Sequence, residues 1–212
     1  MSKDNNTRSG YHHGDLKNAL LDAARRLIVE KGPNGFTLAE AARLAGVSPA
    51  APYRHFKDRR ELLGALAVAG FDDFSERLEN AWENGRPDAV TAFTRVGRAY
   101  LDFAGKDPAA YNAMFEPGMD LREISGLRTA RGRAFDILRT CSAALLARAP
   151  GKILPPVDLM SLHIWSITHG VATLFAEGSL GRGRVPITSE DVLESGVLVY
   201  LRGLGVIPHD AE

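Results

Sequence analysis

The sequence contains almost no cysteine and has no long apolar run. Cys141 is the single cysteine among 212 residues, which excludes an internal disulfide framework and a cysteine-rich zinc site. We expect Cys141 to be a small apolar core residue. No uninterrupted apolar stretch approaches the roughly 18 residues of a membrane-spanning helix, and residues 1–10 are polar throughout. We therefore expect no membrane helix, no signal peptide and a cytoplasmic location.

Net charge is also absent, because 26 Lys and Arg balance 26 Asp and Glu. The two signs are unevenly distributed along the chain. Residues 1–60 carry a net charge of +5, and residues 61–212 carry the compensating −5. This distribution fits a DNA-binding head on a body that does not bind DNA. Charge alone fits proteins that touch no nucleic acid equally well.

No segment shows the sustained alternation of polar and apolar residues that marks a β-strand. Apolar residues instead recur every three or four positions, as in amphipathic helices. With 45% hydrophobic and 25% charged residues, the composition is that of a globular protein with a real core. We predict an all-α fold of about nine helices without internal repeats. The expected helices cover 15–31, 37–46, 48–56, 58–82, 90–101, 107–115, 121–149, 157–177 and 188–204.

Two short helices joined by a tight turn are predicted near the N-terminus. Thr37 and Glu40 have the spacing of a capping box, which starts the first of them. Gly46 can adopt the left-handed conformation that ends it. Ser48 and Pro49 indicate the N-cap and the first position of the next helix. This arrangement matches a helix-turn-helix, whose second helix enters the DNA major groove.

The second short helix and the residues after it carry side chains suited to DNA. Two alanines at its start are small enough to approach base edges and thymine methyl groups. A phenol, a guanidinium and an imidazole follow within one turn, and three further cations can hold phosphates. The alternative is an ordinary helical corner with a solvated basic face. The residues concerned are Ala50, Ala51, Tyr53, Arg54, His55, Lys57, Arg59 and Arg60.

The run from Tyr11 to Phe71 resembles the N-terminal domain of the TetR/AcrR family of transcriptional regulators. That family combines a long first helix, a second helix that opens at threonine and ends in A-x-x-A-G-V-S, and a Y-x-H-F segment before a basic residue and a leucine pair. The matching residues are Thr37, Ala42, Ala45, Gly46, Val47, Ser48, Tyr53, His55, Phe56, Arg59, Leu62 and Leu63.

The arm at residues 11–16 resembles one branch of that family. The C-terminal domain of this branch is named for a W-x-x-x-H-G signature. Trp165, His169 and Gly170 have that spacing, so the resemblance extends to the second half of the chain.

The resemblance implies a set of DNA contacts. The threonine of the second helix and the tyrosine and histidine of the third are expected at phosphates. Two alanines and an arginine are expected nearest the bases, and a lysine and an arginine at the start of the fourth helix are expected on the DNA backbone. The two histidines of the arm are interpreted as phosphate or groove contacts rather than as metal ligands. The set is Thr37, Ser48, Ala50, Ala51, Tyr53, Arg54, His55, Lys57, Arg59, His12 and His13.

Pro52 departs from the pattern, since many family members have leucine there. A proline removes one backbone N–H and biases Ala51 away from the helical conformation. The pitch of the recognition helix is therefore left open, and direct base readout is expected to be sparse, with DNA shape contributing to specificity. We expect Phe56 and Leu44 in the core.

The resemblance further implies a homodimer and an effector. Dimers of helix-turn-helix proteins read two half-sites about 34 Å apart, and the last two helices, 157–177 and 188–204, are expected to pair with their symmetry mates. The middle of the chain is rich in aromatic residues, and pockets favour apolar walls with few polar groups. A small, largely apolar effector is therefore predicted, although His169 is also expected to make a buried hydrogen bond. Candidate contacts are Phe103, Tyr111, Phe115, Trp165 and His169.

These observations predict a sequence-specific DNA-binding regulator, with a DNA-binding domain at 1–60 and an effector-binding and dimerisation domain at 61–212. We expect a homodimeric repressor that binds a palindromic operator and is released by its effector. The sequence does not distinguish a repressor from an activator. A non-specific DNA-binding protein is disfavoured by the zero net charge. No cofactor, metal or enzymatic activity is expected, because no catalytic set or nucleotide loop has the required spacing.

Overall fold

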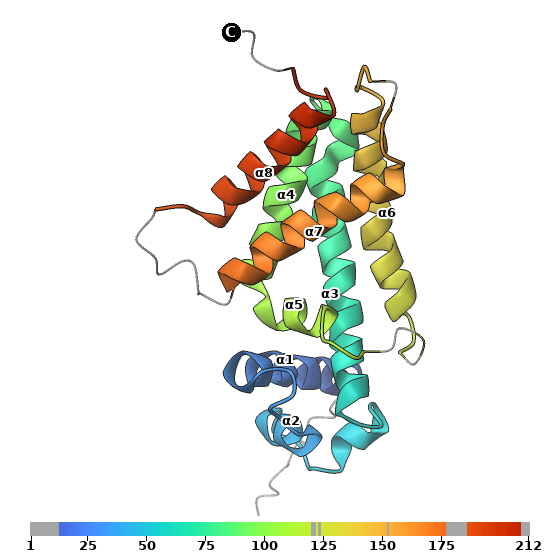
Figure 1. Cartoon of the computed structure of the whole chain (residues 1–212). Coiled ribbons are helices and arrows are strands. Elements are labelled where there is room, and N and C mark those ends of the chain that lie inside the picture. The colour runs from blue at the N-terminus through green and yellow to red at the C-terminus, as the bar shows by residue number, and fades with distance from the viewer. Residues whose placement is uncertain (1–12, 120–121, 123, 152, 177–185, 209–212) are drawn as a thin grey trace, which may run out of the picture.

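The computed structural model describes residues 13–119, 122, 124–151, 153–176 and 186–208. This part of the chain forms eight α-helices and two 3-10 helices and contains no strand, so the all-α prediction is confirmed. A small head holds α1 and α2, and α3 runs from the head through the body (Figure 1). The elements are α1 (His13–Lys31), α2 (Leu38–Leu44), η1 (Ala51–Arg54), α3 (Arg59–Trp82), η2 (Glu83–Gly85), α4 (Ala89–Lys106), α5 (Pro108–Met114), α6 (Leu127–Leu146), α7 (Val157–Ala176) and α8 (Ser189–Gly203).

Helix α3 is the axis of the body, and α4, α5 and α6 pack around it. Its buried side chains include Phe74, whose ring centre lies 4.9 Å from that of Tyr100 and 5.1 Å from that of Phe103 on α4. Helix α5 approaches α3 closely at Gly70, where a Cβ atom would lie 2.9 Å from the sulfur of Met114. A Cβ atom at this crossing would therefore require the Met114 side chain to shift, and it would also lie 3.2 Å from the Cβ of Ala110.

Local capping signals place most helix ends as predicted. Thr37 and Glu40 form the capping box of α2, and Gly46 has φ +73° after it. Asp107 caps α5 through the backbone N–H of Ala110, and proline follows as the first residue of the helix. Thr188 caps α8 in a second capping box. These signals depend on neighbouring residues, so they could be recognised in the sequence.

The prediction of a helix over 48–56 is wrong. The structure has only the 3-10 helix η1 there, and its N-cap is Ala50, which makes no side-chain capping bond, rather than Ser48. The physical reason is Pro52, which supplies no N–H and disfavours the α conformation at the residue before it. The carbonyl of Pro52 instead accepts the N–H groups of His55, at 2.8 Å, and Phe56, at 2.9 Å. Because this helix is missing, the structure has eight α-helices where the sequence predicts about nine.

Three smaller expectations also need correction. Leu44 is 44% exposed and does not belong to the core, whereas Phe56 is buried as predicted. The helix expected from residue 121 begins at Leu127, because Gly126 precedes it with φ +81°. The spacing of Asp58 and Glu61 also predicts a capping box at the start of α3, but this box is only half formed. The Asp58 carboxylate accepts the backbone N–H of Glu61, whereas the Glu61 carboxylate accepts the backbone N–H of Lys57 instead of that of Asp58.

Helix α7 is long and apolar enough to cross a membrane by length and composition. It is not an uninterrupted apolar run, since Asp158, His163 and His169 lie within it. One such helix is weak support for a membrane protein, because a packed helix of a globular protein passes the same test. About a third of this apolar stretch of α7 is already buried inside the chain, and α7 packs against α4, α6 and α8.

Candidate nucleic-acid interface and effector cavity

The turn η1 presents the predicted DNA-reading side chains at the tip of the head. Tyr53 is 62% exposed and Arg54 is also exposed. Neither makes a hydrogen bond or an ion pair within the described residues, so both are available to a partner. Pro52 is buried beneath them and anchors the turn in the head. His55 is half-buried, and its ring centre lies 6.4 Å from that of Phe56.

The start of α2 is held by a network that involves Thr37. Its hydroxyl accepts the backbone N–H of Glu40 at 3.2 Å and donates to the Glu40 carboxylate at 3.1 Å. Lys31 donates to the same carboxylate at 2.7 Å. The Lys31 hydrogen bond, and after it the bonds from Thr37, lower the pKa of Glu40 from 4.5 to about 2. The Glu40 carboxylate is thus ionised at neutral pH, and it keeps Thr37 oriented at the helix N-terminus.

The remaining predicted DNA-binding residues lie in different surroundings. Ser48, Ala50 and Lys57 are exposed, and Ala51 is half-buried. Arg59 is half-buried, and its guanidinium donates to the carbonyl of Pro33 at 2.9 Å and to Asn34 at 2.8 Å. It therefore fastens α3 to the loop between α1 and α2. His12 and the side chain of His13 lie outside the described residues.

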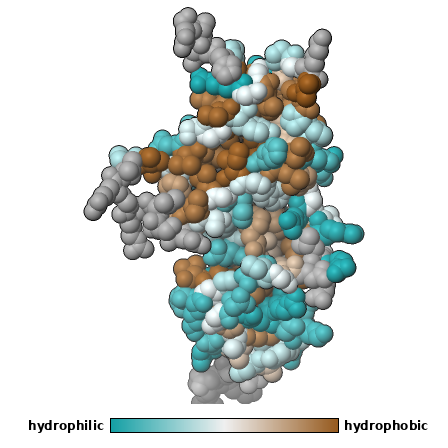
Figure 2. All heavy atoms as spheres, in the orientation of Figure 1, coloured by the Kyte–Doolittle hydropathy of each residue, from teal (hydrophilic) through white to brown (hydrophobic). Residues whose placement is uncertain are grey.

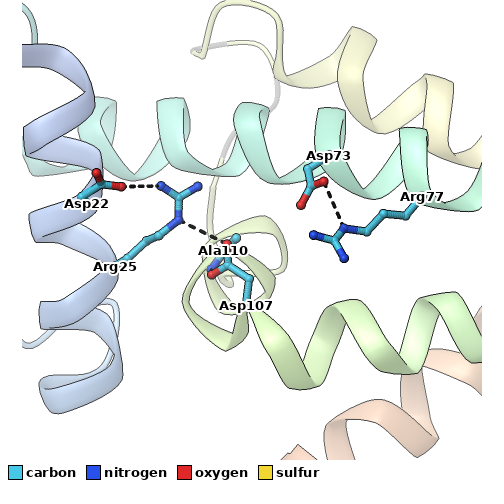
Figure 3. A network of polar contacts seen from close by, with 6 residues as sticks. All are labelled: Asp22, Arg25, Asp73, Arg77, Asp107 and Ala110. Carbon is cyan, nitrogen blue, oxygen red and sulfur yellow. Dashed lines mark hydrogen bonds and ion pairs between the residues drawn. The ribbon is translucent and has the colours of Figure 1, made fainter. Parts of the chain in front are cut away.

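Polar contacts join the head to the segment of the body around α5 (Figure 3). Arg25 on α1 donates to Asp107 at 3.2 Å and pairs with Asp22 on its own helix. Asp107 at the same time caps α5 through Ala110. A second pair in Figure 3, Arg77 with Asp73 at 3.0 Å, lies within α3 and does not reach the head. The carboxylate of Asp107 is thus shared between the two parts of the molecule.

Two further contacts connect the same parts. Asn34, in the loop that receives Arg59, donates to Glu116 just beyond α5. Arg60 at the start of α3 donates to the carbonyl of Gly118 at 3.3 Å. All three connections reach the body between residues 107 and 118. The polar contacts of the body with the head are thus made by α5 and the residues next to it.

A cavity of about 230 Å³ lies in the body between α4, α7 and α8, with α3 and α6 behind it. Its walls are mostly apolar. Among the described residues that line it, charged side chains occur only where α4 meets α8, and there Arg98 pairs with Glu194 at 2.6 Å. A partly open apolar space with a few polar groups is typical of small-molecule sites.

Of the predicted effector contacts, Trp165 lines this cavity. Tyr111, Phe115 and His169 form a cluster beside it, with ring centres 4.9 Å apart for Tyr111 and Phe115 and 4.4 Å for Phe115 and His169. Phe103 does not line it; its ring is fully buried against Phe74 and under the Arg77 guanidinium.

The expected buried hydrogen bond of His169 is present. Its Nδ1 lies 2.7 Å from the hydroxyl of Tyr111 and 3.1 Å from that of Tyr100. Burial lowers the pKa of His169, so the ring is neutral at pH 7. Burial also raises the pKa of both tyrosines, and for Tyr100 the nearby Tyr111 adds to the shift. Both hydroxyls therefore remain protonated.

Sequence reasoning did not assign several lining residues to the cavity. Tyr100 counted only as one of many aromatic residues, and Thr168 was not singled out. The apolar residues of α8 were divided between core and dimer interface without a decision. Their periodicity shows that one face is buried, but not whether it meets a neighbouring helix, an open space or another chain. The residues concerned are Tyr100, Thr168, Leu193, Val197 and Leu201.

The described residues contain no group of three or more histidine, cysteine, aspartate or glutamate side chains that could hold a metal ion. Cys141 is fully buried, and burial raises the pKa of its thiol to about 12. It is therefore an apolar core residue, as expected, and not a reactive nucleophile at neutral pH.

Comparison with known families gives two matches. A profile described as "Bacterial regulatory proteins, tetR family" matches residues 20–66, which include α2, η1 and the start of α3. A profile described as "Tetracyclin repressor-like, C-terminal domain" matches residues 93–200, from α4 into α8. The two matches cover the head and most of the body.

Individual relatives agree with these matches. The chain is 30% identical over 191 residues to the class D tetracycline repressor protein of Escherichia coli, covering 79% of this chain and 88% of that protein. It is 27% identical over 198 residues to the HTH-type transcriptional regulator YobS of Bacillus subtilis, covering 90% and 93%. Both relatives are regulators, not enzymes.

Solved structures show the same fold. A protein of unknown function from Rhodococcus sp. RHA1 has a TM-score of 0.74 at 32% identity, covering 93% of this chain and 100% of that one. The TetR family regulator PfmR of Thermus thermophilus has a TM-score of 0.67 at 22% identity, covering 87% and 98%. Together with the two family matches, these likenesses show that the chain belongs to the TetR family of transcriptional regulators, whose N-terminal helix-turn-helix domain binds DNA.

Proposed function

We propose that this chain is a homodimeric repressor that binds a palindromic operator in the cytoplasm and leaves it when a small molecule occupies the body cavity. The observation that carries the DNA-binding part is the exposed, unpartnered pair Tyr53 and Arg54 at the tip of η1. We place the DNA-binding domain at 1–60 and the effector-binding and dimerisation domain at 61–212. The direction of regulation depends on operator position, so an activator would use the same contacts.

The outer face of α7 and α8 supports dimerisation through these helices. Apolar side chains gather over this part of the body (Figure 2), whereas the head is mostly polar. Five of them are at least 37% exposed in the single chain. Contiguous exposed apolar surface of this kind typically marks a protein interface. Val171, Leu193 and Leu201 are instead buried within the chain. The exposed set is Leu159, Leu162, Leu174, Val192 and Val199.

Coupling between the cavity and the head is proposed to pass through α5. Tyr111 in the middle of α5 hydrogen-bonds to His169 of α7, beside the cavity. Asp107 at the N-terminus of α5 holds Arg25 of the head. A ligand that shifts α7 would therefore move α5 and alter the Asp107–Arg25 contact that holds α1. By linkage, an effector that favours a different head position weakens DNA binding by the same factor by which DNA weakens effector binding.

Selection of bound duplexes from a random pool tests the proposed function. The full chain is expected to enrich a palindrome with two half-sites, because a symmetric dimer presents two identical heads. Selection at two salt concentrations should give the same motif, with weaker binding at the higher one because phosphate contacts release counterions. Salt-sensitive binding without any enriched motif would identify a non-specific DNA-binding protein instead.

Loss of the Arg25–Asp107 pair should relax the spacing that the dimer requires. One inserted base pair moves a half-site by about 3.4 Å and turns it by about 35°, which a firmly held head tolerates poorly. In Arg25→Gln, we expect the affinity ratio between the selected operator and its one-base-pair insertion to fall at least about threefold. Unfolding stability should change by less than about 1 kcal/mol, since the pair is half-exposed.

The matched control is Arg77→Gln, which removes an ion pair of the same kind inside the body. It should leave the ratio unchanged. Equal ratios in wild type and both variants, measured by fluorescence anisotropy, would show that the Arg25 pair does not hold the head.

A further inference from the structure

We propose that the body cavity selects a neutral, mostly apolar molecule with one hydroxyl or carbonyl group, and that this group hydrogen-bonds to Tyr100. This deepens the proposed effector response and rests on it for its biological role. Binding itself can be measured without DNA, so the two can fail separately.

The charges around the cavity determine the charge of the ligand. Among the described residues, the only cationic side chain that lines it is Arg98 on α4, which is already neutralised by Glu194 of α8, with Glu190 of the same helix 4.0 Å away. These three groups are partly or fully exposed and lie where α4 meets α8. An ion within the apolar walls would lose its hydration without gaining a counter-charge, which is strongly unfavourable. A neutral molecule avoids this cost.

The threonines that line the cavity do not offer protons. Thr94 donates its hydroxyl proton to the carbonyl of Val90 at 3.1 Å. Thr168 donates to the carbonyl of Ile164 at 2.9 Å. Each threonine oxygen keeps acceptor capacity, so a hydroxyl on the ligand can donate to it. The indole N–H of Trp165, which also lines the cavity, already hydrogen-bonds to Tyr100. A ligand acceptor therefore requires another donor.

Tyr100 is in a position to be that donor. Each ring nitrogen of a neutral imidazole carries either one lone pair or one proton, yet two tyrosine hydroxyls lie within reach of Nδ1 of His169. Tyr111, at 2.7 Å, has the shorter contact, and Tyr100 follows at 3.1 Å. Of the two tyrosines, only Tyr100 lines the cavity. Tyr100 also hydrogen-bonds to Tyr111, but its hydroxyl is the more weakly held by His169 and is the one that a bound oxygen can engage.

Three probe molecules with the same apolar part test the proposal: 4-butylphenol, butylbenzene and 4-butylbenzoate. Trp165 lines the cavity and can report binding once Trp82, the second tryptophan, is replaced in Trp82→Phe. Calorimetry on the wild-type chain provides an independent measurement. We expect the phenol to bind about fivefold more tightly than the hydrocarbon, as for one net hydrogen bond, and at least about tenfold more tightly than the benzoate.

Tyr100→Phe should weaken phenol binding about fivefold and leave butylbenzene binding unchanged. Tyr200→Phe is the matched control, because Tyr200 also pairs with a histidine, His163, but does not line the cavity; phenol binding should change less than about twofold. Three results would overturn the proposal. These are benzoate binding as tight as phenol binding, an equal loss for phenol and hydrocarbon in Tyr100→Phe, and no saturation by any probe below about 1 mM.

Release from the selected operator is then measured separately with 4-butylphenol. Binding with the expected pattern and an intact operator complex would support the cavity assignment and contradict the effector response. Operator release that is unaffected by Tyr100→Phe would contradict the role of Tyr100.

Discussion

The double substitution Tyr53→Ala/Arg54→Ala is expected to lower affinity for the selected operator about 100-fold or more. Each side chain that contacts a base or phosphate contributes about 1–3 kcal/mol in such complexes, and a dimer loses each contact twice. Both side chains are exposed and make no polar contact within the described residues. The unfolding free energy should therefore stay within about 0.5 kcal/mol of wild type.

Fluorescence anisotropy with the selected duplex measures this loss, and circular dichroism checks the fold. Arg131→Ala on α6 is the control, since Arg131 is an exposed arginine of the body. It removes the same charge without touching η1 and should have little effect on affinity. An operator affinity within about threefold of wild type in the double variant would show that η1 is not the reading element.

Leu162→Arg combined with Val199→Arg should convert the dimer into monomers. The two side chains are 53% and 71% exposed in the single chain, so arginine fits at both positions in a folded monomer. In a dimer formed by α7 and α8, the new charges would be buried against their symmetry mates. We expect sedimentation equilibrium to give the single-chain mass of 23.0 kDa at micromolar concentration. Operator affinity should fall at least about 100-fold, because one head remains.

Val29→Arg provides the matched control. Val29 on α1 is 65% exposed, so the same substitution is made on a surface outside α7 and α8. That variant should keep the mass of the wild type. A dimeric mass for the double variant would place the interface elsewhere on the chain.

The parts of the fold that could be predicted depend on interactions between close neighbours in the sequence. Thr37 with Glu40, Asp107 before Pro108, and Thr188 with Asp191 each define a helix start within four residues. The effect of Pro52 was visible in the sequence, but its extent was not. Whether one proline shortens a helix to a single turn depends on how firmly the surrounding head holds that turn.

Features that depend on tertiary packing could not be predicted. The match at Arg59 implied a contact with the DNA backbone, but it did not reveal that the guanidinium donates to the carbonyl of Pro33 and the amide of Asn34, 26 and 25 positions earlier. The cavity brings together side chains from five helices, and a helical repeat does not reveal which buried face adjoins empty space. Tyr100 became identifiable only when its distance to His169 was known.

The continuous helix α3 gives small movements in the body a large effect at the DNA. Its 24 residues correspond to a rod of about 36 Å, at about 1.5 Å per residue. If the body end turns by about 5°, the head end swings by about 3 Å, and the two symmetric heads together change their separation by about 6 Å. That is close to the rise of two base pairs in a site whose half-sites lie about 34 Å apart. In the proposed dimer, a ligand would therefore need to tilt the rod by only a few degrees to put both heads out of register with the groove.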